Sequence, residues 1–234
     1  MENYLSSPSF GDFAALVENE DVMQHLVGFL LFQQKYESAI KEIRTKLDIL
    51  NSEFNVRHGH NPIHHIESRL KRPVSIMRKL ERNGCELTLA AARENLMDIA
   101  GIRVICSYIE DVYRVASLLT QHDDLFLVRT KDYIKNPKPN GYRSLHLIIQ
   151  TPVCLSDRAE MVPVEIQIRT VAMDFWASLE HEIRYKTNNE IPENIHRELK
   201  GCAEISAALD AKMQEIYVTV VDKDEPEQQN NEEA

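Results

Sequence analysis

The sequence predicts an α/β (α+β) fold in which a mixed β-sheet is flanked by helices, with helical extensions at both ends of the chain. Apolar residues recur at helical spacing near both termini, segments in the middle alternate like strands, and only seven of 234 residues are glycine. A chain of this length buries one core but is short for two full domains. We expect four parts: a helical extension over 1–58, a central domain over 59–190, a C-terminal helix over 191–220 and a disordered acidic tail over 221–234.

The first half of the chain is predicted to be mainly helical. After a flexible lead over 1–15, one or two helices are expected over 20–52, because these apolar residues have helical spacing: Leu26, Phe29, Leu30, Ile40, Ile43 and Leu47. Gly59 and Pro62 interrupt the pattern. Pro73 suits the first position of a helix that ends at Asn83-Gly84, and a short helix fits residues 89–97.

The second half alternates strands with helices. Strands are predicted near 99–108, 125–133, 142–151 and 162–170, with a helix over 111–121 between the first two. Helices return over 174–186, where Phe175, Trp176 and Leu179 are expected in the core, and over 192–218. The acidic tail has almost no apolar content to offset the entropy of ordering, so we expect it to be disordered.

The charge distribution is uneven. The net charge of −10 argues against general affinity for nucleic acid or anionic membranes, so neither a stable nucleic-acid partner nor a membrane is expected. Residues 69–82 nevertheless carry six cations against Glu81 alone. The four cysteines form no CxxC pair, so reduced thiols are expected rather than a zinc ribbon or redox dithiol. Without a signal peptide or an apolar run of about 20 residues, we expect a cytoplasmic protein.

A lysine-rich loop and a nearby strand predict a nucleotide site. In KDYIKNPKPNGYRSLH, residues 131–146, three lysines supply positive charge for phosphates, and Asn140-Gly141 permits a turn that brings the backbone close to a ligand. Tyr142, Ser144 and His146 then share one face of a predicted strand. In VEIQIRT, residues 164–170, Val164, Ile166 and Ile168 are predicted to be buried, which leaves this polar set side by side: Glu165, Gln167 and Arg169.

The predicted helix over 73–82 has two faces. Val74, Met77 and Leu80 form the expected inward stripe, whereas these polar residues lie close together on another face: Ser75, Lys79 and Arg82. On its own, such a charged helix usually has just a solvated face. The phosphate loop elsewhere in the chain favours a binding role instead.

These segments, together with DIAGIRV at 98–104 and SRLKRPVSIMRKL at 68–80, resemble the RelA/SpoT-type (p)ppGpp synthetases. The resemblance covers residues 60–190 and comprises four motifs in the order of the family. Because the chain has no room for hydrolase or regulatory domains, it resembles a small alarmone synthetase of the RelQ or RelP kind. The resemblance implies a nucleotidyltransferase-like synthetase fold over 59–190 and a homotetramer that assembles through terminal helices.

The reaction that the resemblance implies is transfer of the β,γ-pyrophosphoryl group of ATP to the ribose 3′-hydroxyl of GDP or GTP, with release of AMP. Mg²⁺ is the implied cofactor, and Asp98 and Glu165 match the catalytic and metal positions. Whether Glu165 acts mainly as base or as metal ligand stays open. The residues implied to bind ATP are Arg69, Lys71, Ser75, Lys79, Arg82 and Arg103. Those implied to bind GDP or GTP are Lys131, Lys138, Tyr142, His146 and Gln167.

Each of these residues also has an ordinary interpretation. Single carboxylates usually lie on the surface, and an aromatic residue in a strand usually packs in the core. The set His58, His60, His64 and His65 suggests zinc, but Pro62 disturbs helical spacing and no acidic or cysteine ligand is near, so a loop is expected there. His181 and Lys186 are signature positions of the family that would support the site.

Other functions remain open at this point. One is a toxic relative that makes adenosine alarmones or pyrophosphorylates tRNA 3′ ends; the acidic composition disfavours the tRNA version. Another is a noncatalytic nucleotide sensor or RNA-binding module, against which the presence of both Asp98 and Glu165 argues. Asp174 stands where regulated members of the family carry an amide, so regulation by pppGpp is not inferred.

Overall fold

The computed structural model describes residues 20–187 and 191–224, and it contains a five-stranded sheet in the order β1-β2-β5-β4-β3. The strands are β1 (Ile63–Leu70), β2 (Ala100–Cys106), β3 (Phe126–Asp132), β4 (Leu145–Cys154) and β5 (Ala159–Thr170). Strands β2 and β5 pair in parallel, and the other neighbours are antiparallel. The sheet is therefore mixed, as predicted.

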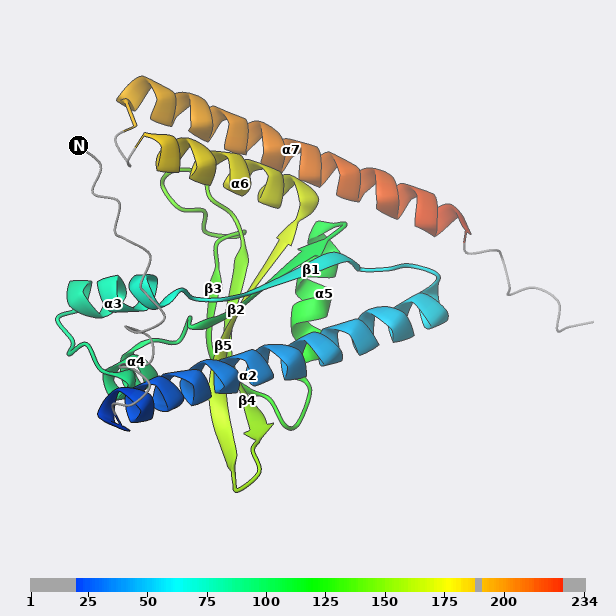
Figure 1. Cartoon of the computed structure of the whole chain (residues 1–234). Helices are drawn as coiled ribbons and strands as arrows, with labels where there is room; N and C mark the ends of the chain where they lie inside the picture. The colour runs from blue at the N-terminus through cyan, green and yellow to red at the C-terminus, as the bar shows by residue number, and fades with distance from the viewer. Residues whose placement is uncertain (1–19, 188–190, 225–234) are drawn as a thin grey trace, which may run out of the picture.

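Helices lie on both sides of the strands (Figure 1). They are α2 (Glu20–His58), α3 (Pro73–Arg82), α4 (Leu89–Asn95), α5 (Ile109–Thr120), α6 (Val171–Lys186) and α7 (Glu193–Asp224). In Figure 1, α2 crosses the lower part of the sheet, whereas α6 and α7 lie side by side above it. None of the described helices is long and apolar enough to cross a membrane.

The core forms where apolar residues of α2 and α5 meet the sheet. One face of α2 is buried at helical spacing, through Tyr36, Ile40, Ile43 and Leu47 among others. The sheet contributes alternating residues of its central strands, such as Val164, Ile166 and Ile168 of β5, all fully buried. The opposite face of β5 is thereby left to its polar residues, as the sequence predicted.

Strand β1 corrects one sequence prediction. The sequence predicts a loop at the histidine set from His58 to His65, but Ile63–Leu70 forms an edge strand, and His64 and His65 lie in it. Its residues IHHIESRL are mostly polar and exposed, so hydrophobic alternation does not reveal it. Its partner does: β1 pairs along its length with the buried β2, and such a pairing is invisible in local sequence.

The ends of several elements also differ from their predicted positions. Strand β4 begins at Leu145 rather than 142, so Tyr142 lies in the loop before it. Helix α2 is one helix that extends to His58. Helix α7 continues to Asp224, past the start of the predicted disordered tail. The predicted lead over 1–15 and the last ten residues of the chain lie outside the described residues.

Two predicted apolar faces are wrong in part. In α3 the buried residues are Ile76 and Leu80, whereas Val74 and Met77 are exposed. In α6 Trp176 is buried, but Phe175 is 66% exposed and Leu179 44% exposed. The reason is that α6 packs against α7 through Trp176 and Ala177, which cluster with Ala203, and this contact does not cover Phe175 and Leu179. Hydrophobicity alone does not say which of two apolar stripes a neighbouring helix covers.

Candidate active site

Residues from every strand meet in one row across the sheet. The register places Lys131 of β3 opposite His146 of β4, His146 opposite Gln167 of β5, and Gln167 opposite Arg103 of β2. Arg103 in turn faces Glu67 of the edge strand β1 and donates to its carboxylate at 3.2 Å. Side chains at facing positions of neighbouring strands project from the same face of a sheet. The row therefore brings residues predicted for both nucleotides to one surface.

Beside this row lies a small cleft of about 70 Å³ between β1, β2 and β5. Its lining includes Arg69, Asp98, Arg103, Glu165 and Gln167, which come from three of the four sequence motifs. The parallel pairing of β2 with β5 explains the meeting, because Gly101 lies opposite Glu165. Both predicted acidic residues thus face one cavity.

Asp98 is held by two cations. Its Oδ2 accepts hydrogen bonds from Nζ of Lys71 at 2.5 Å and of Lys79 at 2.6 Å, so the turn before β2 is tied to the end of β1 and to α3. Burial raises the pKa of Asp98, but the hydrogen bonds and charges of the two lysines outweigh it and lower the pKa below its ordinary value. Its Oδ1 is buried and accepts no hydrogen bond from any described residue.

Glu165 receives two hydrogen-bonded chains that both start at Arg169. In the shorter chain, Arg169 Nη2 donates to Gln167 Oε1 at 2.9 Å, and Gln167 Nε2 donates to Glu165 Oε2 at 3.1 Å. In the longer chain, Arg169 Nη2 donates to Tyr142 Oη at 2.5 Å, Tyr142 Oη lies 2.9 Å from His146 Nε2, and His146 Nδ1 lies 3.3 Å from Glu165 Oε1. The two chains fix the orientation of the carboxylate.

The protonation of Glu165 follows from these contacts. Burial raises its pKa, whereas the hydrogen bond and charge of His146 and the hydrogen bond from Gln167 lower it; nearby Asp98 raises it slightly. The net pKa is below that of an ordinary glutamate. Glu165 is therefore an anion at neutral pH, able to accept a proton or to bind a cation.

The loop between β3 and β4 is rigidly built. Asp132 Oδ1 accepts from the backbone N–H groups of Ile134 and Lys135, and the Asn140 side chain accepts from the N–H of Tyr142. Gly141 has a φ of 91°, in the region that favours glycine, as the Asn-Gly turn predicted. We call residues 133–144 the acceptor loop, after the role that the sequence predicts for it.

Cations and aromatic rings lie together in this loop. Lys138 Nζ lies 4.7 Å from the ring centroid of Tyr142 and 4.8 Å from that of Tyr133, within the range of cation–π attraction. Tyr142 is only half-buried, so its ordinary role as a core residue does not apply fully. Flat rings and a cation at this place suit a base and its phosphates.

The sequence model of the family described as "Region found in RelA / SpoT proteins" matches residues 68–190, more than half of the chain. The chain belongs to this family. This RelA/SpoT chain is 56% identical over 178 residues to the GTP pyrophosphokinase YwaC of Bacillus subtilis, covering 76% of this chain and 85% of that protein.

Solved structures agree on the fold. The small alarmone synthetase 2 from Bacillus subtilis matches with a TM-score of 0.74 and 52% identity, over 80% of this chain and 97% of that one. The small alarmone synthetase 1 from the same organism, in a structure bound to its product pppGpp, matches with a TM-score of 0.76 and 34% identity, over 82% and 98% of the two chains. The α+β fold with a mixed sheet, predicted from the RelA/SpoT resemblance, is confirmed.

The structure places most predicted site residues of this RelA/SpoT chain around the cleft, but not all. Ser75 and Arg82 are exposed on α3, next to Lys79 on the helix but without a recorded side-chain contact to the cleft. Lys131 is exposed on β3, and its place in the row rests on the strand register. Lys186, expected to support the site, pairs instead with Glu182 one turn earlier.

Sequence reasoning missed two residues that organise the site. Arg169 is only 4% exposed and is the origin of both chains that reach Glu165. Its position on the polar face of VEIQIRT was predicted, but its burial was not. Asp174 Oδ1, at the start of α6, accepts from Arg169 at 3.0 Å and lies 3.4 Å from Arg103 Nη1, so it joins the arginine from which both chains start to the Arg103 of the row. No local signal distinguishes Asp174 from a surface carboxylate.

The residues present fit a magnesium ion. Asp98 offers a buried oxygen that no described residue satisfies, and Glu165 is an anion that lines the same cleft. Mg²⁺ is commonly bound by one or two carboxylates together with substrate phosphates and water, so two acids suffice. No three His, Cys, Asp or Glu residues of the described chain form a group able to hold a metal by themselves.

Proposed function

We propose that the chain transfers the β,γ-pyrophosphoryl group of ATP to the 3′-hydroxyl of GDP or GTP, producing ppGpp or pppGpp and releasing AMP. The observation that carries the proposal is the cleft that both Asp98 and Glu165 line: Lys71 and Lys79 bind Asp98, and the acceptor loop is linked to Glu165 through Tyr142 and His146. The chain matches most of the length of a GTP pyrophosphokinase and of two small alarmone synthetases, and this similarity supports the same reaction.

For the donor, we propose that the cations of β1, α3 and β2 bind the triphosphate of ATP. Arg69 and Arg103 line the cleft directly, and Lys71 and Lys79 reach it through Asp98. Ser75 and Arg82, on the same helix as Lys79, would contact the outer part of ATP. Guanidinium and ammonium groups stabilise phosphate charge through charge-assisted hydrogen bonds.

For the acceptor, we propose that Tyr142 stacks on guanine and that Lys131, Lys138 and His146 bind its phosphates. Lys138 lies over the ring of Tyr142, and His146 contacts both Tyr142 and Glu165. Gln167, between His146 and Arg103 in the row, lies where the two nucleotides would meet. This order across the sheet supports a position of the acceptor ribose next to Glu165.

The chemistry then depends on position and charge. Glu165 orients the 3′-hydroxyl and takes its proton as the oxygen attacks the β-phosphorus of ATP. The cations that face the cleft stabilise the charge on the transferred group and on the departing AMP, and binding both nucleotides in one cleft aligns the attack. Asp98 and Glu165 would hold a Mg²⁺ ion, which would further neutralise the charge of the phosphates.

We also propose that the chain assembles as a homotetramer in the cytoplasm, through its terminal helices. The exposed apolar residues of α7 recur along one side, at Ile205, Leu209, Met213 and Ile216, and α6 adds Phe175 and Leu179. A row of exposed apolar side chains is typical of a surface that binds a partner. Mass photometry across a dilution series measures the assembly; a monomer at micromolar concentration would contradict it.

The test of the activity is incubation with Mg²⁺, ATP labelled in its β- and γ-phosphates and one acceptor at a time: GDP, GTP, ADP, ATP or deacylated tRNA. We expect label on GDP and GTP together with AMP. Label on adenosine nucleotides or tRNA would replace the proposal by the toxic branch of the family. No transfer to any acceptor would favour a nucleotide sensor. Glu165→Gln is the matched control, because it changes one charge and keeps the shape of the side chain.

A further inference from the structure

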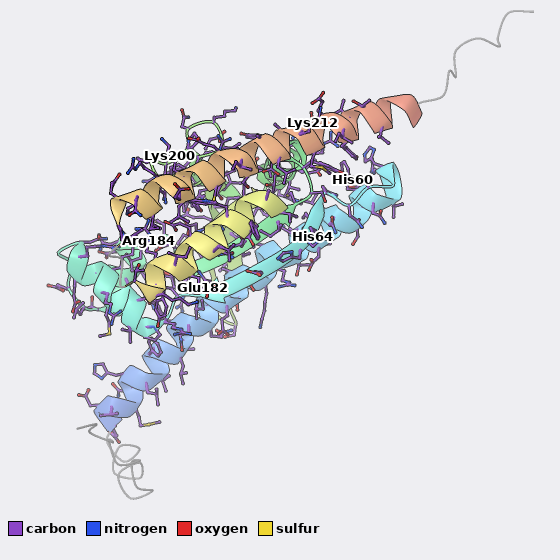
Figure 2. The ribbon with its side chains drawn as sticks, turned by 90° about the horizontal axis from the view of Figure 1, so that it is seen from above. His60, His64, Glu182, Arg184, Lys200 and Lys212 are labelled. Carbon is purple, nitrogen blue, oxygen red and sulfur yellow. The ribbon has the colours of Figure 1, made fainter. Side chains whose placement is uncertain are left out.

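The acceptor loop packs against helices α6 and α7, which lie outside the sheet. In Figure 1 the connection between β3 and β4 rises from the strands towards α6. Figure 2 shows α6 and α7 side by side from above, with Arg184 near the end of α6 and Lys200 in the first part of α7. Three separate contacts join the loop to this helix pair.

The tightest contact is between Gly141 and Ala203 of α7. A methyl group added at Gly141 would lie 2.5 Å from Cβ of Ala203, closer than two carbon atoms approach. Ala203 itself is only 4% exposed. Gly141 is thus needed for two reasons, its φ of 91° and the lack of room above it. A larger residue at 203 would press on the loop in the same way as a side chain at 141.

The other two contacts lie on either side of this point. Tyr142 packs against a small cluster made of Trp176, Ala177 and Ala203. Asn140 Nδ2 donates at 3.2 Å to Glu180 Oε1 of α6, a buried carboxylate that Arg184 also holds. Trp176 Nε1 donates to the backbone carbonyl of Leu199 at 2.8 Å, which fixes α6 against α7.

We propose that Ala203 is a positioning residue for the acceptor: its methyl group sets the height of Gly141, and thereby the place of the neighbouring Tyr142 ring. This inference rests on the proposed role of the loop in binding GDP or GTP. Helix α7 lies outside residues 68–190 that define the family, so part of the acceptor specificity of this chain resides in a helix that the family region does not contain. Among the described residues, the cluster around Ala203 consists of Trp176, Ala177 and Tyr142, none of which belongs to the donor side on β1, β2 and α3.

The test compares Ala203→Val with Ala211→Val, the same change at an exposed position two turns later on α7. We expect Ala203→Val to raise KM for GDP by roughly tenfold, equal to about 1.4 kcal/mol, while KM for ATP stays within about twofold. Ala211→Val should leave both constants near wild type. Equal changes of both KM values in Ala203→Val, or no change in either, would overturn the proposal, because they would indicate general disruption or no coupling.

A double-variant cycle keeps the inference testable if Ala203→Val folds poorly. Gly141→Ala should weaken GDP binding strongly in the wild-type background and less strongly when combined with Ala203→Gly, because the second change removes the clash but not the strain at positive φ. The same loss in both backgrounds would show that the two residues do not interact.

The readout that separates this inference from the proposed activity is binding without turnover. Isothermal titration calorimetry measures GDP affinity in the absence of ATP. Trp176, the single tryptophan of the chain, lies in the cluster that Tyr142 contacts, so its emission should change on addition of GDP. If the wild-type protein binds GDP but transfers nothing, the proposed reaction is wrong, whereas the double-variant cycle at residues 141 and 203 still tests how Ala203 affects GDP binding. Unchanged GDP affinity in Ala203→Val would overturn the positioning role alone.

Discussion

Glu165→Gln removes the charge on which the proposed chemistry depends and little else. The amide has nearly the same shape as the carboxylate and still offers one oxygen to Gln167 Nε2 or His146 Nδ1, which lie 3.1 and 3.3 Å from the native oxygens. Both chains from Arg169 end at this side chain, so its orientation should persist. The variant therefore separates the charge of residue 165 from its position.

The expected loss follows from the state of Glu165. Its lowered pKa makes it an anion at neutral pH, ready to accept the proton of the 3′-hydroxyl. A positioned general base contributes about 10²–10⁴-fold, and loss of one metal ligand would add to this. We expect kcat to fall by about 10³-fold or more. The free energy of unfolding should change by less than about 1 kcal/mol, because the charge lost is partly offset by relief from nearby Asp98.

The assay is initial-rate AMP release with saturating ATP and GDP, beside thermal unfolding monitored by circular dichroism. GDP titration by calorimetry confirms that the variant still binds the acceptor. Turnover within about tenfold of wild type would refute the role of Glu165 as base or ligand. A large fall in the unfolding midpoint would instead show that the residue is mainly structural.

Three further predictions follow from the same geometry. Tyr142→Ala should raise KM for GDP and GTP by roughly tenfold to a hundredfold, as loss of base stacking costs about 1–3 kcal/mol, with KM for ATP little changed; equal kinetics for the acceptor would contradict stacking. Asp98→Asn removes the carboxylate that Lys71 and Lys79 share, so the free energy of unfolding should fall by about 1–2 kcal/mol. The variant should also need a higher Mg²⁺ concentration for its half-maximal rate; an unchanged Mg²⁺ requirement would exclude Asp98 as a metal ligand. The pKa values of Asp98 and Glu165 in the folded protein lie below those of ordinary carboxylates, so the stability that these ionised groups contribute is present above the ordinary pKa and is lost as pH falls through the folded pKa. Wild type should therefore lose more stability on acidification than Asp98→Asn. Parallel curves of stability against pH for the two proteins would argue against the lowered pKa.

Sequence reasoning was most successful where local pattern and physical cause coincide. The alternation in VEIQIRT predicted the burial of Val164, Ile166 and Ile168 of β5, because period two places them on the one covered face, although it did not predict that Arg169 is buried too. Pro73 predicted the first residue of α3 through its fixed φ, and Asn140-Gly141 predicted the positive φ at the turn. The resemblance supplied what such patterns do not, the roles proposed for Asp98 and Glu165.

The features that escaped prediction are those set by distant neighbours. Strand β1 exists because β2 pairs with it, and its own polar residues give no signal. The row from Lys131 to Glu67 depends on four registers at once. The buried face of α6 is chosen by α7, so Trp176 was placed correctly whereas Phe175 and Leu179 were not. Which stripe a helix buries is decided by its partner, not by its own sequence.

The measurement that tests the central claim most directly is ³¹P NMR of the protein with Mg²⁺, ATP and GDP. We predict that AMP and a guanosine product with a new 3′-diphosphate form in equal amounts, with both phosphorus atoms of that diphosphate coming from ATP. This result requires one cleft that binds both nucleotides and transfers two phosphates as a unit. Formation of ADP with phosphate, or of AMP with free pyrophosphate and unchanged GDP, would contradict the account, because water and not the 3′-hydroxyl would then be the acceptor.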